Sequence, residues 1–427
     1  MFSQINFLKD EIDNFKNDGF VNNLIIILYS LFPLFLIIGT ALSELAIISL
    51  CFYFISDFFL KKENIFKNKL FYFLIFIYLV LMINLIFSFN FSNSFLRNFF
   101  FIKYIIFILG TINFLSKKKY RISILFKIWS VILAIFALDM FIQFFLGKNL
   151  VGIESPLKFH RVSGFMGDEL KAGSLLLGLS LVPACFLIEN GKYKNIGFLM
   201  IILFLSAIFI SGDRSNFIKS LIVICSLCFF VKKELLKKLL ILFAFLTTFV
   251  VIILSNFETL NDRYKNKIFS KLASNNFSLI EFIDKTEYGK IYYTGIKLFQ
   301  DNKFFGVGNK NFRLLCEEKF QKEFLEKNNI VEEKFRCNNH PHQIYIEILS
   351  EHGLLGLLTL AILLIIFIRD NLSFILKKRN LLLSCLFLVI LINFTPILPG
   401  GSFFTSFNST IFWLNFSLFY AIKKTIN

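Results

Sequence analysis

Three of the four histidines of this 427-residue chain lie between positions 340 and 352, where a long polar segment meets a long apolar one. Pro341 suits the first position of a helix, so we expect His340 to cap a membrane helix and His342 to stand in its first turn. Free N–H groups at a helix N-terminus favour anions. Imidazole titrates near neutral pH, so His342 is a candidate general base; the alternative is a histidine that only caps or hydrogen-bonds at a helix end.

Two carboxylates follow on the same predicted helix. Glu347 and Glu351 are spaced one helical turn apart, and a membrane helix rarely carries two carboxylates without partners. We expect them either to orient His342 or to pair with an arginine from the outer side. His352, one residue further on, is expected to be structural.

Arginines at the ends of apolar runs form a second group of candidates. Arg214 lies in Ser211-Gly212-Asp213-Arg214-Ser215, a tight link between two apolar runs. A snorkelling anchor is the alternative, which the positive-inside rule disfavours on the outer face. Arg161 and Arg263 lie in polar segments, where arginines are common. Because a planar guanidinium can hold a phosphate through two hydrogen bonds, all three are candidates for binding a phosphorylated substrate.

No motif for a metal, nucleotide or nucleic-acid site is found in the sequence. Asp168 and Glu169 are adjacent, so on a helix their carboxylates would point apart. There is no Gly-x4-Gly-Lys-Ser/Thr loop, and the cysteines and histidines lack zinc-ligand spacing. Most of the net charge of +17 falls in short loops between apolar runs, which the positive-inside rule explains without nucleic acid.

Long apolar runs determine the predicted architecture. Hydrophobic residues make up 56% of the chain, which indicates an all-α polytopic membrane protein. Residues 1–18 carry apolar positions at helical spacing among polar ones, as a short interfacial helix would. About twelve spans are predicted, at roughly 20–38, 41–60, 70–88, 96–115, 122–146, 170–189, 196–210, 215–231, 239–255, 343–368, 380–396 and 403–422.

Lysines and arginines set the predicted orientation. Basic loops follow every even-numbered span, so these loops and both termini are expected to face the cytoplasm. The long segment 256–341 then lies outside, between spans nine and ten, and contains two amphipathic stretches that predict helices. The predicted division is 1–255 for the interfacial helix and spans 1–9, 256–341 for the outer loop, and 342–427 for spans 10–12.

These motifs occur in the order typical of a known family. Over residues 150–420 the chain resembles the bacterial O-antigen ligase and O-antigen polymerase family of polytopic membrane glycosyltransferases. The most specific feature is His342-Gln343, nine residues, Gly353, two residues and Gly356, at the start of a span after a large outer loop. Supporting motifs are Arg161-Val162-Ser163-Gly164-Phe165, Ser211-Gly212-Asp213-Arg214-Ser215, Arg263, and Phe305-Gly306-Val307-Gly308 with Phe312.

The resemblance implies glycan transfer on the periplasmic face of the bacterial inner membrane, without a metal or other cofactor. The donor would be a glycan on undecaprenyl pyrophosphate, and a ligase would deliver it to a sugar hydroxyl of the lipid A core. By motif position, His342 would deprotonate that hydroxyl, while Arg214 and Arg263 would neutralise the pyrophosphate leaving group. Further candidates are Arg161, His340, Gln343 and Glu347 for substrate binding, and Gly353 and Gly356 for structure.

The acceptor stays open on these motifs, so an O-antigen polymerase or a protein O-oligosaccharyltransferase of the same family is an alternative. From another class, a twelve-span transporter or a lipid-linked glycan flippase remains. Two six-span halves joined by a cytoplasmic loop would favour that class, whereas here the largest polar segment follows the ninth span. The chain departs from the family pattern at Asp168-Glu169, where members often carry His-Pro-Asn, and at Gln343, where asparagine is commoner.

Cys316 and Cys337 both lie in the outer segment, whereas the other five cysteines lie in apolar runs. In an oxidising compartment the two thiols can pair, and the disulfide would tie a helix of the outer segment to the chain entering His340. The alternative is two free thiols too far apart to bridge, since the sequence does not supply the Cα separation that a disulfide requires.

Overall fold

The computed structural model describes residues 11, 13–61, 69–155, 161–231, 233–266, 286–321 and 335–426, and these fold almost entirely into helices. Within these ranges there is no β-strand, and an isolated β-bridge joins Lys148 to Glu154. The all-α fold predicted from the apolar runs is therefore confirmed. Most of the predicted interfacial helix at 1–18 lies outside the described residues.

Eight helical stretches in the described part of the chain are long and apolar enough to cross a membrane. They are formed by α4 (Thr40–Lys61), α5 (Lys69–Ile86), α6 (Phe91–Phe99) with α7 (Ile102–Ser116), α8 (Lys119–Leu146), α9 (Ala172–Leu179) with α10 (Leu181–Glu189), α11 (Lys194–Ile210), α13 (Lys233–Asn256) and α20 (Ile344–Lys378). A ninth results if α2 (Phe20–Ser30) and α3 (Phe32–Ile38) form one span bent by 49°. Pro33 in the first turn of α3 lacks a backbone donor, which explains this break.

Three of the predicted spans form helices that do not meet this standard. α12 (Arg214–Leu227) has 14 residues, hence a length of about 21 Å against the roughly 30 Å of a bilayer core. α21 (Leu381–Leu391) is also short, even with the 3-10 turn Ile392–Phe394 that follows. α22 (Ser406–Ile426) is long enough but contains several serines and asparagines and a pair of lysines. Twelve crossings therefore stay a prediction, although each predicted run folds as helix.

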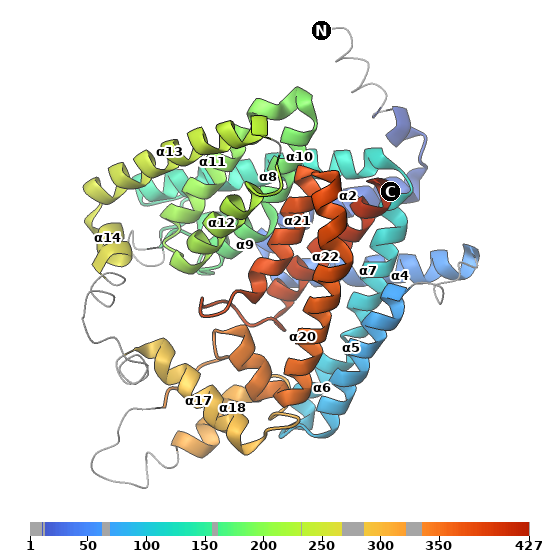
Figure 1. Ribbon diagram of the computed structural model, residues 1–427, viewed down its shortest axis with the longest axis vertical. Helices are drawn as coiled ribbons and strands as arrows, with labels where there is room; N and C mark the ends of the chain where they lie inside the picture. The colour runs from blue at the N-terminus through green and yellow to red at the C-terminus, as the bar shows by residue number, and fades with distance from the viewer. Residues whose placement is uncertain are drawn as a thin grey trace.

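α22 occupies the centre of the helix bundle (Figure 1). It contacts α4, α7, α9 and α21. Helices α8 and α10 to α13 gather on one side of it, and α5 to α7 lie on the other. α17 (Glu287–Asp301) and α18 (Phe312–Cys316), which belong to the segment 256–341, pack against α20 at the lower end of the view in Figure 1.

The long helix α20 is broken at Gly353, where φ is 64° and ψ is −159°. Only glycine adopts this conformation without strain, and the break leaves backbone groups of both half-helices without helical partners. A broken membrane helix is tolerated when another segment satisfies these groups. Loop 303–308 does so through four hydrogen bonds: Val307 N to Ser350 O (2.8 Å), Gly308 N to Glu351 O (2.9 Å), Leu354 N to Lys303 O (2.8 Å) and Leu355 N to Phe304 O (3.1 Å).

Replacing Gly353 by alanine is expected to destabilise the fold by about 2 kcal/mol or more, because strain and a steric clash add. A Cβ there would lie 2.4 Å from the carbonyl oxygen of Phe304, which is backbone and cannot move aside cheaply. Thermal unfolding in detergent measures the effect. Gly39→Ala is the matched control, because no atom lies within 4 Å of its added Cβ. Equal melting temperatures for the two variants would contradict the structural role of Gly353.

Buried asparagines hold the same loop from the opposite side. Asn84 of α5 donates from Nδ2 to the carbonyls of Phe305 and Glu351, both at 2.8 Å. Asn98 of α6 accepts at Oδ1 from Asn309 Nδ2 at 2.8 Å. Because buried amides are costly unless hydrogen-bonded, these contacts fix loop and half-helix against α5 and α6.

Candidate active site

His342 lies immediately before α20, not in its first turn as predicted. Gln343 is the N-cap residue instead of His340, because its side-chain oxygen accepts from Ile346 N at 2.9 Å. His342 has a φ of 59°, a left-handed conformation that non-glycine residues adopt rarely. Strained backbone of this kind concentrates at functional sites.

The imidazole of His342 is held by two neighbours. The His340 ring lies beside it, with the ring centroids 4.0 Å apart. The side-chain amide of Asn338 lies 3.1 Å from His342 Nε2. Asn338 Oδ1 accepts from the backbone N–H of Asn339 at 2.7 Å, so its NH₂ group faces the imidazole. Nε2 of neutral His342 is therefore the acceptor, and the proton resides on Nδ1.

Burial keeps both imidazoles neutral. The pKa of His342 falls to about 4, chiefly through burial and then through His340, while backbone hydrogen bonding to Gly400 and the charge of Glu347 raise it partly. The pKa of His340 also falls to about 4, through burial and then through the charge of Lys310. At neutral pH, His342 is thus able to accept a proton.

Glu347 is buried beneath these histidines and is hydrogen-bonded at both oxygens. Its Oε1 accepts from the Ser402 hydroxyl, and its Oε2 accepts from Phe403 N at 3.1 Å. Lys310 Nζ donates to the same Ser402 oxygen at 2.7 Å. Buried carboxylates are stable only with such partners. Lys310, Ser402 and Glu347 thus form a continuous hydrogen-bonded chain.

The three predicted arginines converge. Arg214 Nη1 donates to the carbonyl of Arg263 at 3.2 Å, and Arg263 Nε donates to the carbonyl of Gly212 at 2.6 Å. Arg161 Nη2 lies 3.7 Å from Asp213 Oδ2. Burial lowers the pKa of Arg263, and the nearby charges of Arg161 and Arg214 lower it further. The surplus of positive charge suits an anion, since Asp213 offsets only part of it.

One loop connects this arginine cluster to His342. The carbonyl of Pro399 accepts from Ser215 Oγ and from Lys219 Nζ, the latter at 3.1 Å. Both residues are on α12, and Ser215 directly follows Arg214. The next residue, Gly400, donates its N–H to the carbonyl of His342 at 2.7 Å. The carbonyl of Pro399 and the N–H of Gly400 belong to one peptide unit, so a single peptide unit connects the start of α12 to the residue before α20.

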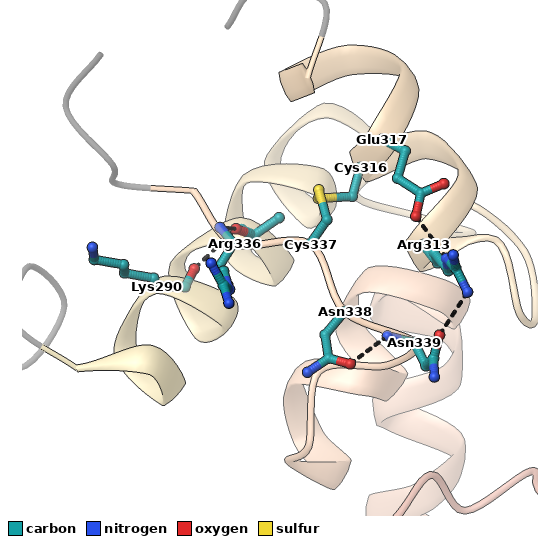
Figure 2. The surroundings of a disulfide bond; sticks show 9 residues. Lys290, Arg313, Cys316, Glu317, Arg336, Cys337, Asn338 and Asn339 are labelled. Atoms are coloured by element: carbon teal, nitrogen blue, oxygen red, sulfur yellow. Dashed lines mark hydrogen bonds and ion pairs between the residues drawn. A yellow bond between two sulfur atoms is a disulfide. The ribbon is translucent and has the colours of Figure 1, made fainter. Parts of the chain in front are cut away.

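Cys316 and Cys337 form a disulfide, with their Cα atoms 5.7 Å apart (Figure 2). It joins the end of α18 to the residue that precedes Asn338. Arg313 reinforces the connection, since its Nη1 donates to Asn339 Oδ1 at 2.8 Å. The outer segment is thus fastened beside the side chain that contacts His342.

We expect mass spectrometry of the non-reduced protein, with thiols blocked at lysis, to find Cys316 and Cys337 linked. The bridge closes a loop with a sequence separation of 21 residues. Closing such a loop stabilises a fold by roughly 3 kcal/mol on the chain-entropy model. The double substitution of both cysteines by serine should lower the melting temperature, whereas Cys225→Ser, at an exposed thiol, serves as the control. Alkylation of both Cys316 and Cys337 without reduction would contradict the pairing.

Other predicted residues lie apart from these groups or have structural contacts. Gln343 uses its side-chain oxygen as the helix cap and is buried. His352 is buried against Phe404, with ring centroids 4.7 Å apart. Asp168 and Glu169 are both exposed, and within the described ranges no group of three or more His, Cys, Asp or Glu residues is placed to share a metal ion.

Four polar residues that the fold connects to the site were not predicted from the sequence: Asn338, Lys310, Ser402 and Lys219. Lys310 was the easiest of these to predict, because it lies two residues after the Gly306-Val307-Gly308 turn. Lys219, a buried cation in an apolar helix, was a second signal, since such residues are expensive without a function. Nothing in the sequence around Asn338 or Ser402 indicated that either residue would lie at the site.

Comparison with known protein families gives a match over part of the chain. Residues 199–361 match the family model described as O-antigen ligase. The matched region includes Arg214, Arg263 and His342, and Arg161 lies before it. No curated protein matches the chain. The match supports the resemblance to the O-antigen ligase and O-antigen polymerase family, whose members are glycosyltransferase-like enzymes.

Proposed function

We propose that the protein is an O-antigen ligase-type glycosyltransferase that moves a glycan from undecaprenyl pyrophosphate to a sugar hydroxyl of the lipid A core. The observation that carries this proposal is the peptide unit of Pro399 and Gly400, which bonds Ser215, the neighbour of Arg214, on one side and the backbone carbonyl of His342 on the other. Such a site combines a base with cations for a phosphate leaving group, which is the pairing that glycosyl transfer from a pyrophosphate needs.

In the proposed reaction, the acceptor hydroxyl takes the place of the Asn338 amide at His342 Nε2. Nε2 accepts the hydroxyl proton as the hydroxyl oxygen attacks the anomeric carbon of the donor. The bond from that carbon to the pyrophosphate oxygen breaks, and the electron pair stays on the leaving oxygen. Arg214 and Arg263 neutralise the charge that develops there, with Arg161 assisting. The buried Nε of Arg161 has no hydrogen-bond partner among the described residues, so it is available to a phosphate oxygen.

The location follows from the charge pattern. Basic loops point to cytoplasmic termini, so the site would face the periplasm from the inner membrane, where lipid-linked donor and acceptor both lie in the bilayer. Glu347 and His340 would support His342 in its role as base. The proposed reaction uses no cofactor. We therefore expect the reaction to be insensitive to chelators.

Two alternatives within the family differ in the acceptor alone, which is another repeat unit for a polymerase and a protein for an oligosaccharyltransferase. The lipopolysaccharide profile of a deletion strain separates them. Lipid A core without polymer supports the ligase, single repeats on the core support the polymerase, and unglycosylated protein with normal lipopolysaccharide supports the oligosaccharyltransferase. Loss of the transferred glycan together with retention of the lipid-linked glycan on the cytoplasmic face of the membrane would favour a flippase.

A further inference from the structure

Lys310 is the cation nearest to the buried histidine and carboxylate groups, and no motif assigned it a role. It lies on the turn after Gly308 with a φ of 65°, and its backbone carbonyl accepts from Asn93 Nδ2 at 2.6 Å. The strained turn and this hydrogen bond fix the backbone of Lys310. Its side chain is half-buried and reaches Ser402.

The contacts of Ser402 give the connection a direction. Lys310 Nζ can only donate, so the Ser402 oxygen accepts that hydrogen bond. The Ser402 hydroxyl then donates its own hydrogen bond to Glu347 Oε1. Ser402 and Glu347 are both buried, so a charge at one end of the chain is only weakly screened at the other. Glu347 in turn favours the protonated form of His342.

We propose that Lys310 is a positioning residue for transfer: through Ser402 it holds the Glu347 carboxylate ionised and oriented, so that Glu347 can stabilise the imidazolium formed at His342. The proposal rests on the function proposed above. The proton involved moves from the acceptor hydroxyl to His342 Nε2, and neither Lys310 nor Glu347 gains or loses one during the step.

Among the described residues, few other ionisable groups lie near His342 and Glu347. His340 lies against His342, Tyr288 of α17 faces His342 with ring centroids 5.7 Å apart, and Glu351 lies one turn along α20. Lys310 is the cation in this set. Losing it removes the group that offsets the paired carboxylates Glu347 and Glu351.

Lys310→Met should lower kcat by about 10- to 100-fold, the range typical of residues that orient a functional side chain, with little change in the KM for donor. The acid limb of the pH profile, which reports protonation of His342, should move to lower pH, because without Lys310 the Glu347 carboxylate supports the imidazolium less. Lys310→Arg should restore most of the rate and the normal profile. Ser402→Ala should reproduce the pH shift, since it breaks the same chain of hydrogen bonds.

Lys303→Met is the matched control, because it removes an exposed lysine from the same loop. The assay uses the full-length protein in detergent, with undecaprenyl-pyrophosphate glycan and core lipid extracted from the deletion strain. Wild-type kcat and pH profile in a folded Lys310→Met variant would overturn the positioning role while leaving the proposed function intact. No transfer by the wild-type protein, by contrast, would overturn both. A loss of rate in Lys310→Met and Lys310→Arg alike, without any pH shift, would also refute the role.

Discussion

Replacing His342 by asparagine is expected to abolish detectable glycan transfer, with a loss of about 10²- to 10⁴-fold, the usual contribution of a positioned base. Asparagine is the informative substitution, because it tolerates the positive φ of 59° at this position better than alanine does. It therefore removes the base without adding backbone strain. The rate is measured with purified protein, donor lipid and acceptor lipid.

The pH dependence sharpens this prediction. Because the pKa of His342 lies at about 4 in the folded protein, the imidazole is neutral at pH 6 and above. The acid limb of kcat/KM should therefore fall near pH 4 to 5, well below the ordinary histidine value of about 6.5. A folded His342→Asn variant with near-normal transfer, or an acid limb at pH 6.5, would remove His342 from the role of base.

The second large effect is expected at the arginine cluster. Arg214→Lys and Arg263→Lys keep the charge but lose the planar fork, and each should lower kcat/KM by about 10- to 100-fold, equivalent to roughly 1.5–3 kcal/mol for a hydrogen bond to a charged group. Arg263 also uses its Nε on the carbonyl of Gly212, a contact that lysine cannot reproduce in the same geometry.

Arg369→Lys is the control for this pair, because Arg369 is exposed and pairs with its neighbour Asp370. It should transfer at the wild-type rate. Melting temperatures separate loss of binding from loss of fold. Wild-type kinetics in both Arg214→Lys and Arg263→Lys would mean that the cluster supports the fold and does not bind the leaving group.

The helices were predictable because an apolar run can be recognised from its own sequence, without knowing which elements it packs against. Arg214 and His342 were also recognisable from their own surroundings, the first in a tight link between apolar runs and the second at the junction of polar and apolar segments. Gly353 was assigned a structural role, but the break in α20 was not foreseen, since a single glycine in an apolar run does not reveal that loop 303–308 satisfies the freed backbone.

Residues that act through long-range contacts could not be predicted. Ser402 meets Glu347 across 55 positions, and Lys310 meets Ser402 across 92. Asn338 contacts His342 over 4 positions, but the strained turn at His342 sets that geometry. Nothing periodic in the sequence encodes such pairs. The number of membrane crossings could not be predicted for a related reason, because α12 and α21 are short helices whose depth depends on their neighbours.

A single-turnover assay of the purified protein tests the central claim most directly. Wild-type protein and the His342→Asn variant are mixed with undecaprenyl-pyrophosphate glycan and core lipid from the deletion strain, and the lipid products are identified by mass spectrometry. The account predicts that the wild-type protein yields glycan-bearing core lipid together with free undecaprenyl pyrophosphate, and that the variant yields neither. Release of undecaprenyl pyrophosphate without any glycosylated acceptor, or equal product from both proteins, would contradict it.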